Sequence, residues 1–202
     1  MAASRCLAAS CALPLIAIAM PAAAYDINGY AVGNHRSCNA SNLPGTIAEM
    51  DKLFASAEFP EDARKNFLWK DTRVRLGEWA TANDRFENRD TANGFDGADS
   101  SLISYIASHG ITTAAKYSAL AGGTNGGCRI NNTDMGLGDQ TSRYLILSTC
   151  QGLKIGNGDD PDRTGENPSV TWRSGNSGLN CIFGYSNNMV DSDLYGVNLL
   201  HN

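Results

Sequence analysis

The sequence has no basic cluster and no interleaving of aromatic with basic side chains. Its 16 Lys and Arg residues are outnumbered by 21 Asp and Glu residues. Recognition of nucleic acid, or of an anionic membrane surface, requires a concentrated positive patch. The net charge of −5 and the scattered basic residues therefore argue against both kinds of partner. The sequence also lacks an internal repeat and a linker-like stretch, which favours a single domain.

Long apolar runs are also absent, apart from one at the N-terminus. Residues 6–20 (CLAASCALPLIAIAM) follow Arg5 and precede small residues at 22–24. This run is shorter than the roughly 20 residues that span a bilayer, and the order of charge, apolar run and small residues is typical of a signal peptide. We expect residues 1–24 to be cleaved. Residues 25–202 would then form one α/β domain that is secreted or periplasmic.

Only four cysteines remain after that cleavage: Cys38, Cys128, Cys150 and Cys181. In an exported protein the simplest expectation is two disulfides, for which three connectivities exist. Cys38 and Cys128 both fall in polar loops after predicted strands, so we expect them to pair and to leave Cys150 free. Cys181 lies in an apolar segment, which favours a small core residue.

Metal-binding spacings are scarce as well. The sequence has no CxxC or HxxxH pattern, so a zinc site built from His35, His109 and cysteines has no support. The acidic segment 156–167 superficially resembles an EF-hand loop, but Thr171 stands where such a loop carries its bidentate glutamate. A solvated acidic loop is the favoured interpretation and calcium the alternative, and we expect no cofactor.

Short apolar segments alternate with helical patterns along the chain. Residues 46–57 and 112–120 are predicted helices, and an amphipathic pattern begins at 192–200. Strands are predicted at residues 26–32, 66–69, 74–79, 102–106, 144–147 and 179–185. This alternation indicates an α/β fold whose mostly parallel sheet is covered by helices on both faces.

Two of the predicted buried strands end in a chemically useful residue. Residues 102–106 lead into Ala-Ser-His109-Gly110, and residues 144–147 lead into Ser-Thr-Cys150-Gln-Gly. Open α/β sheets build their sites at the carboxyl ends of strands, and the ends of neighbouring strands lie about 5 to 10 Å apart. A thiolate is a strong nucleophile, and a nearby imidazole can favour it or supply a proton. Gly110 would let a substrate backbone approach and leave its N–H open to an oxyanion.

At these positions the sequence resembles the clan of cysteine peptidases that contains caspases, legumains, gingipains and clostripain. The resemblance covers residues 99–185 and rests on an apolar block that ends in His-Gly, followed by a second that ends in Cys. Cys150-Gln151-Gly152 is similar to the caspase cysteine context, although Thr149 stands where many members carry alanine. A group of bacterial secreted caspase-like domains, with a Thr-Cys-Gln turn and a later Gly-Leu…Gly-Tyr strand, is more similar still.

The resemblance implies a caspase-like three-layer sandwich that cleaves peptide or protein substrates. Its last helix–strand unit is expected to be absent, because the sequence ends where another helix begins. By this resemblance Cys150 is the nucleophile, His109 is the general acid and base, and the N–H groups of Gly110 and Cys150 form the oxyanion hole.

Substrate-binding residues and the overall role leave alternatives open. Asp99 is a candidate for an acidic specificity pocket and Trp172 for the lining of the cleft, with a surface role and a core role as their respective alternatives. Further acidic candidates for that pocket are Asp134, Asp139 and Asp191. Besides a secreted cysteine endopeptidase, the sequence fits an inactive caspase-like binding domain, or a structural protein in which Cys150 is bridged.

Overall fold

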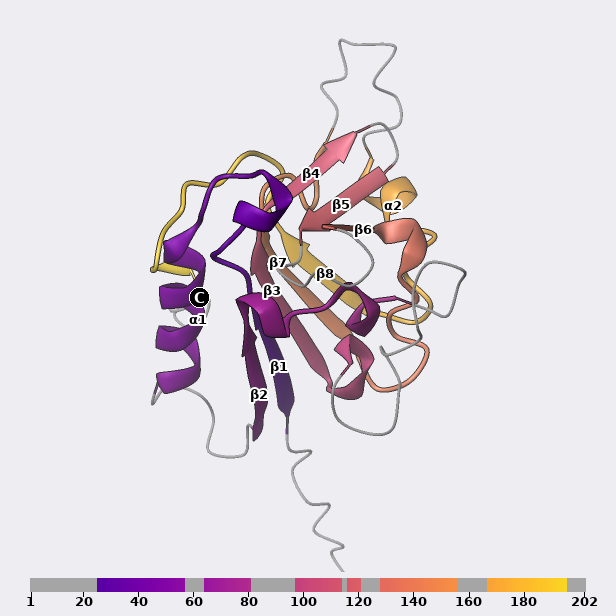
Figure 1. Cartoon of the computed structure of the whole chain (residues 1–202). Coiled ribbons are helices and arrows are strands. Elements are labelled where there is room, and N and C mark those ends of the chain that lie inside the picture. The colour runs from indigo at the N-terminus through magenta and orange to yellow at the C-terminus, as the bar shows by residue number, and fades with distance from the viewer. Residues whose placement is uncertain are drawn as a thin grey trace, which may run out of the picture.

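A central sheet of five parallel strands organises the protein (Figure 1). The computed structural model describes residues 25–56, 64–80, 97–113, 116–120, 128–155 and 167–195. The strands lie in the order β2-β1-β3-β7-β8, and every neighbouring pair is parallel. Their bounds are β1 Asp26–Ala31, β2 Arg64–Lys70, β3 Ile103–Ser108, β7 Tyr144–Thr149 and β8 Cys181–Gly184. The predicted α/β class with a mostly parallel sheet is confirmed.

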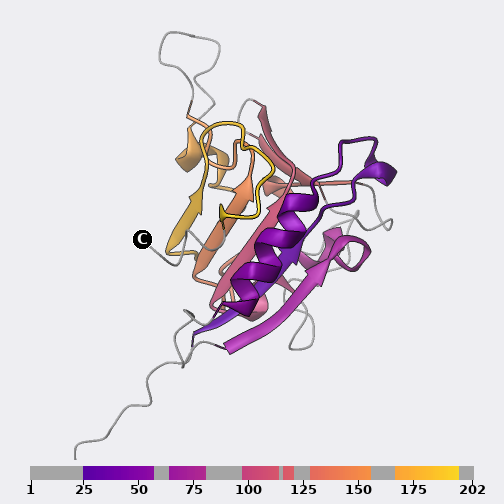
Figure 2. The ribbon, with the colours of Figure 1, turned by 90° about the vertical axis from the view of Figure 1, so that its left-hand side faces the viewer.

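Helix α1 (Pro44–Ala55) covers one face of this sheet (Figures 1 and 2). Proline near the start suits a helix, because its fixed φ is already helical and the first N–H groups lack partners anyway. The helix places Met50 and Leu53 on the sheet, both fully buried. They pack with Ile27, Ala31, Tyr105 and Ala107 of the strands in one apolar cluster. The helix predicted at 46–57 is confirmed, with its start two residues earlier.

The opposite face is covered differently from the sequence-based expectation. A small antiparallel sheet, β4 (Gly110–Thr113), β5 (Lys116–Leu120) and β6 (Arg129–Asn131), contributes to this side. Short helical turns complete the cover, among them η3 (Leu76–Glu78) and the four-residue α2 (Pro168–Thr171). Trp79, Tyr117 and Trp172 are the large buried side chains of this second core. In the described residues, therefore, one face carries the long helix α1, and the other carries the small antiparallel sheet and short helical turns.

Two segment predictions are wrong. The described residues of the segment 112–120 are not helical: β4 and β5 pair in an antiparallel manner, with Thr113 opposite Lys116. Two consecutive threonines are β-branched and favour extended backbone, and Thr112 and Tyr117 both point inward. Residues 74–79 contain the turn η3 and no strand, and Val74 and Trp79 on either side of the turn are buried.

Two further predictions fall outside the described residues, namely the signal peptide at 1–24 and the acidic segment at 156–166. In the part of the chain that the structure describes, no helix is long and apolar enough to cross a membrane.

Replacing Leu53 by alanine is expected to cost about 2–5 kcal/mol of unfolding free energy, because the side chain is fully buried between α1 and the sheet. Urea unfolding measures this loss. The matched control is Ile155→Ala, since Ile155 is 67% exposed, and its expected effect is within about 0.5 kcal/mol. Equal midpoints for the two variants would contradict the packing of α1 described here.

Candidate active site

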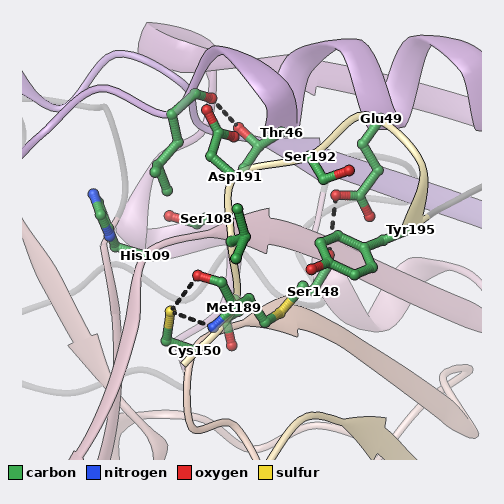
Figure 3. A pocket seen from close by; sticks show the side chains of 13 residues that line it. Thr46, Glu49, Ser108, His109, Ser148, Cys150, Met189, Asp191, Ser192 and Tyr195 are labelled. Atoms are coloured by element: carbon green, nitrogen blue, oxygen red, sulfur yellow. Dashed lines mark hydrogen bonds between the residues drawn. The ribbon is translucent and has the colours of Figure 1, made fainter. Parts of the chain in front are cut away.

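The register between β3 and β7 places His109 and Cys150 at the same edge of the sheet. Ser108, the last residue of β3, lies opposite Thr149, the last residue of β7. His109 and Cys150 are the next residue of each chain segment, so both follow the carboxyl ends of adjacent parallel strands. The structure thus brings together the two residues that the sequence singled out (Figure 3).

Both side chains line one cavity of about 70 Å³. The strand ends form one wall and the start of α1 another. The third wall belongs to residues 186–195, here named the covering segment. The lining residues are Leu43, Thr46, Glu49, Ser108, His109, Ser148, Thr149, Cys150, Met189, Val190, Asp191, Ser192 and Tyr195.

The orientation of His109 is fixed by the loop that precedes α1. Its Nε2 lies 2.8 Å from the carbonyl oxygen of Ser41. A carbonyl oxygen only accepts, so Nε2 must donate, and in the neutral imidazole Nδ1 is then the nitrogen that can take up a proton. The ring is therefore held in the tautomer that leaves Nδ1 available for acid–base chemistry.

His35 packs directly against His109, with 4.6 Å between the ring centroids. It is fully buried and donates from Nε2 to the carbonyl oxygen of Val32 at 2.9 Å. Burial, and secondarily the charge of His109, lower the pKa of His35 to about 4. His35 is consequently uncharged at neutral pH and supports the ring of His109 without competing for its proton.

The sulfur of Cys150 is partly buried and faces the backbone of the covering segment. The N–H of Met189 donates to Sγ at 3.2 Å, and the carbonyl oxygen of Met189 lies 3.8 Å from Sγ (Figure 3). A donor aimed at sulfur binds a thiolate more strongly than a thiol, because such a hydrogen bond is charge-assisted. The N–H of Met189 thus favours a thiolate, whereas its carbonyl oxygen, which accepts from the S–H group, favours the thiol.

Gly110 and Gln151 hold the two strand ends and their neighbours together. A Cβ atom on Gly110 would lie 2.6 Å from the carbonyl oxygen of Cys150, so only glycine fits there. Gln151 has a φ of 57°, donates from its backbone N–H to Asn187 at 3.0 Å, and accepts from the N–H of Thr112 at 3.2 Å. The residue after the cysteine therefore ties the β4 hairpin and the covering segment to the site.

Glu49 is a site residue that the sequence reasoning missed. Its carboxyl group is buried and lines the cavity from α1. It accepts hydrogen bonds from the hydroxyl of Tyr105 at 2.5 Å and from that of Ser148 at 3.0 Å. Burial raises the pKa of Glu49 from 4.5 to about 7; the two hydrogen bonds oppose the shift, and Asp191 adds to it. The available signal was a glutamate on the same face of the predicted helix as Met50 and Leu53.

Asp99 lies at the opposite end of β3 from His109, so its expected substrate-binding role is corrected. It sits in the turn η5 (Ala98–Ser100) that precedes the strand. Its buried carboxylate accepts the backbone N–H groups of Gly138, Gln140 and Ser142 at 2.7–3.1 Å. Burial raises the pKa of Asp99 to about 6. Asp99 therefore organises the loop before β7 instead of contacting the cavity.

Trp172 also lies away from the cavity, in the core of the other sheet face. Its ring packs against that of Tyr117 with the centroids 5.1 Å apart, and its Nε1 donates to the carbonyl oxygen of Gly152 at 2.9 Å. The expectation that Trp172 lines the cleft is replaced by the core role.

Among the other acidic candidates, Asp134 accepts the backbone N–H of Asn131 at 3.2 Å, and neither it nor Asp139 lines the cavity. Asp191 alone of the four acidic candidates does.

The structure joins Cys38 to Cys128 by a disulfide, with their Cα atoms 5.4 Å apart. This bond links the loop that carries Ser41 to the start of β6. Cys150 is free. Cys181 is also free but exposed at the start of the edge strand β8, so the expected core position of Cys181 is wrong. Among the described residues, no group of three His, Cys, Asp or Glu side chains is arranged to hold a metal ion.

The fold and site together define an α/β protein with a cysteine and a histidine at the carboxyl ends of adjacent parallel strands. The family model described as "Domain of unknown function (DUF6345)" matches residues 28–200, so the chain belongs to this family. The match begins within β1 and includes the other four strands of the central sheet, His109 and Cys150. No curated protein and no solved structure matches the chain.

The raised pKa of Glu49 makes stability depend on pH in a defined direction. Between pH 4.5 and 7 the folded state holds a proton that the unfolded state releases, so this group's contribution to stability falls as pH rises through that window. A shift of this size corresponds to roughly 3 kcal/mol as an upper bound. Relative to Glu49→Gln, the wild type should lose up to that amount between pH 5 and pH 8, measured by urea unfolding at each pH. Parallel pH profiles for the two proteins would show that Glu49 titrates normally.

Proposed function

We propose that this protein is a caspase-like cysteine peptidase acting outside the cytoplasm, with Cys150 as nucleophile and His109 as general acid and base. The observation that carries the proposal is the register of β3 and β7, in which Ser108 lies opposite Thr149. The two following residues then open into one cavity. The signal-like residues 1–24 are the basis for the secreted or periplasmic location.

The chemistry follows from the positions of these groups. The Cys150 thiolate attacks the carbonyl carbon of a peptide bond, and the resulting oxyanion is stabilised by the N–H groups of Gly110 and Cys150. Protonated His109 gives its Nδ1 proton to the leaving amine, and a thioester to Cys150 remains. A water molecule then attacks the thioester as His109 takes up its proton, which releases the acid and restores the thiolate–imidazolium pair.

The geometry around His109 supports this assignment of roles. The bond from Nε2 to Ser41 fixes the ring, and the uncharged His35 packs on it without adding a second positive charge. A general base needs both a fixed orientation and an available nitrogen, and Nδ1 has both. The finer fold assignment, a caspase-like three-layer sandwich, rests on the resemblance of the His-Gly and Cys-Gln-Gly blocks and belongs to the same proposal.

One observation favours a second candidate, a non-catalytic binding domain of the same fold. The backbone of Met189 lies against the sulfur of Cys150, where a substrate backbone would have to approach. In a binding domain this contact would be permanent, and in a peptidase the covering segment must yield to substrate. The reactivity of Cys150 separates the two.

Iodoacetamide alkylation of Cys150 is expected to be fast at pH 6–7, where an ordinary thiol of pKa about 8.5 reacts slowly. Replacing Cys181, which is exposed and free, by serine in every protein leaves one described free thiol to follow by mass spectrometry. The His109→Ala variant should react at least about tenfold more slowly in this pH range, and Cys150→Ala should lose peptide hydrolysis by about a thousandfold or more. Slow alkylation that is the same with and without His109 would reject the peptidase and leave the binding domain.

A further inference from the structure

The cavity beside Cys150 changes in chemical character along its length. Cys150 and Glu49 lie at opposite ends of the group of lining side chains (Figure 3). Leu43, Met189 and Val190 supply apolar surface, and hydroxyl groups such as Ser148 lie nearer the carboxyl of Glu49. A ligand that fits this cavity has an apolar stem and a polar head.

The charge of the lining selects the sign of that head. Two carboxyl groups, from Glu49 and Asp191, face the cavity, and they are close enough for Asp191 to raise the pKa of Glu49. Within the part of the chain that the structure describes, the lining includes no lysine or arginine, and its one histidine, His109, lies on the side away from Glu49 (Figure 3). An acidic ligand would meet like charge, whereas a cation would relieve the repulsion between the two carboxylates.

The carboxyl group of Glu49 is positioned to bind such a cation. The hydroxyls of Tyr105 and Ser148 fix its carboxyl group, and a carboxylate has about four lone-pair sites, so two remain for a ligand. Asp191 lies against Gly45 at the start of α1, so closely that a Cβ on Gly45 would clash with it. Asp191 itself is exposed, so Glu49 is the buried carboxyl group of the pair.

We infer that this cavity receives the side chain of a lysine or arginine from the substrate, with Glu49 as the main specificity-determining residue and Asp191 as its auxiliary. The inference rests on the proposed peptidase function and names its substrate class: peptides cleaved at a basic residue. The stem of such a side chain packs on Leu43 and Met189, and its charged head meets Glu49. Burial raises the pKa of Glu49 to about 7, and a bound cation favours the ionised carboxylate.

The first experiment measures hydrolysis of fluorogenic peptides that differ only at the residue before the cleaved bond: Arg, Lys, Gln, Leu or Asp. The wild type should prefer Arg and Lys over Leu by about 100-fold or more in kcat/KM. Glu49→Gln, which keeps the size and a hydrogen-bonding head, should reduce that preference at least about tenfold while Cys150 still alkylates. The control is Glu78→Gln, a buried glutamate in the turn η3 away from the cavity, which should leave the preference unchanged.

The second experiment does not depend on catalysis. Agmatine, an alkyl guanidinium, should slow the alkylation of Cys150 by occupying the cavity, and its uncharged analogue butylurea should not. The protection should be lost in Glu49→Gln. If the protein hydrolyses none of the peptides but shows this protection, the peptidase proposal is wrong and the cation-binding site is retained. Hydrolysis that prefers Gln, Leu or Asp, or that Glu49→Gln leaves unaltered, would retain the peptidase and overturn the basic specificity.

Discussion

The parallel pairing of β3 with β7 is the constraint on which the candidate site depends. Side chains alternate between the two faces of a strand, so a slip of one residue would turn His109 or Cys150 toward the other face. Two features beyond the ladder fix the register. Gly110 packs against the carbonyl of Cys150 at a distance that admits no Cβ, and the hydroxyls of Tyr117 and Thr149 are hydrogen-bonded at 2.8 Å in the core. The β4–β5 pair that follows His109 therefore fixes the position of the end of β7, which Cys150 follows.

The loop between β1 and α1 is the second support of the site. It contributes His35 behind the ring of His109 and the carbonyl of Ser41 that binds its Nε2. The loop is anchored at its start, where Asp71 accepts the N–H groups of Gly33 and Asn34, both at 2.8 Å, and the Cys38–Cys128 disulfide ties it to β6. A surface loop is ordinarily one of the least rigid parts of a domain. Here the crosslink and the buried histidine restrict it where a fixed imidazole is needed.

Sequence patterns predicted those parts of the structure that depend on local apolar periodicity. The apolar runs at 102–106 and 144–147 located β3 and β7, and the residues after each run located the site, because a parallel sheet brings its carboxyl ends together. The pattern could not reveal what each segment packs against. Residues 112–120 have a helix-compatible composition, but the β-branched Thr112 and Thr113 lie opposite residues of the next strand. Asp99, for its part, precedes β3 instead of following it. Only the tertiary structure decides such cases.

Glu49 shows why a buried polar residue is the hardest to interpret from sequence. On α1 it shares a face with Met50 and Leu53, and an apolar side chain there would add to the core that those two residues already form with the sheet. Burying a carboxyl group costs free energy that two hydroxyl donors only partly offset, as its raised pKa records. Stability alone thus gives no reason for a glutamate at this position. The cavity that the carboxyl group of Glu49 shares with Cys150 offers a reason. A cation bound there would favour the ionisation of Glu49, which burial otherwise opposes.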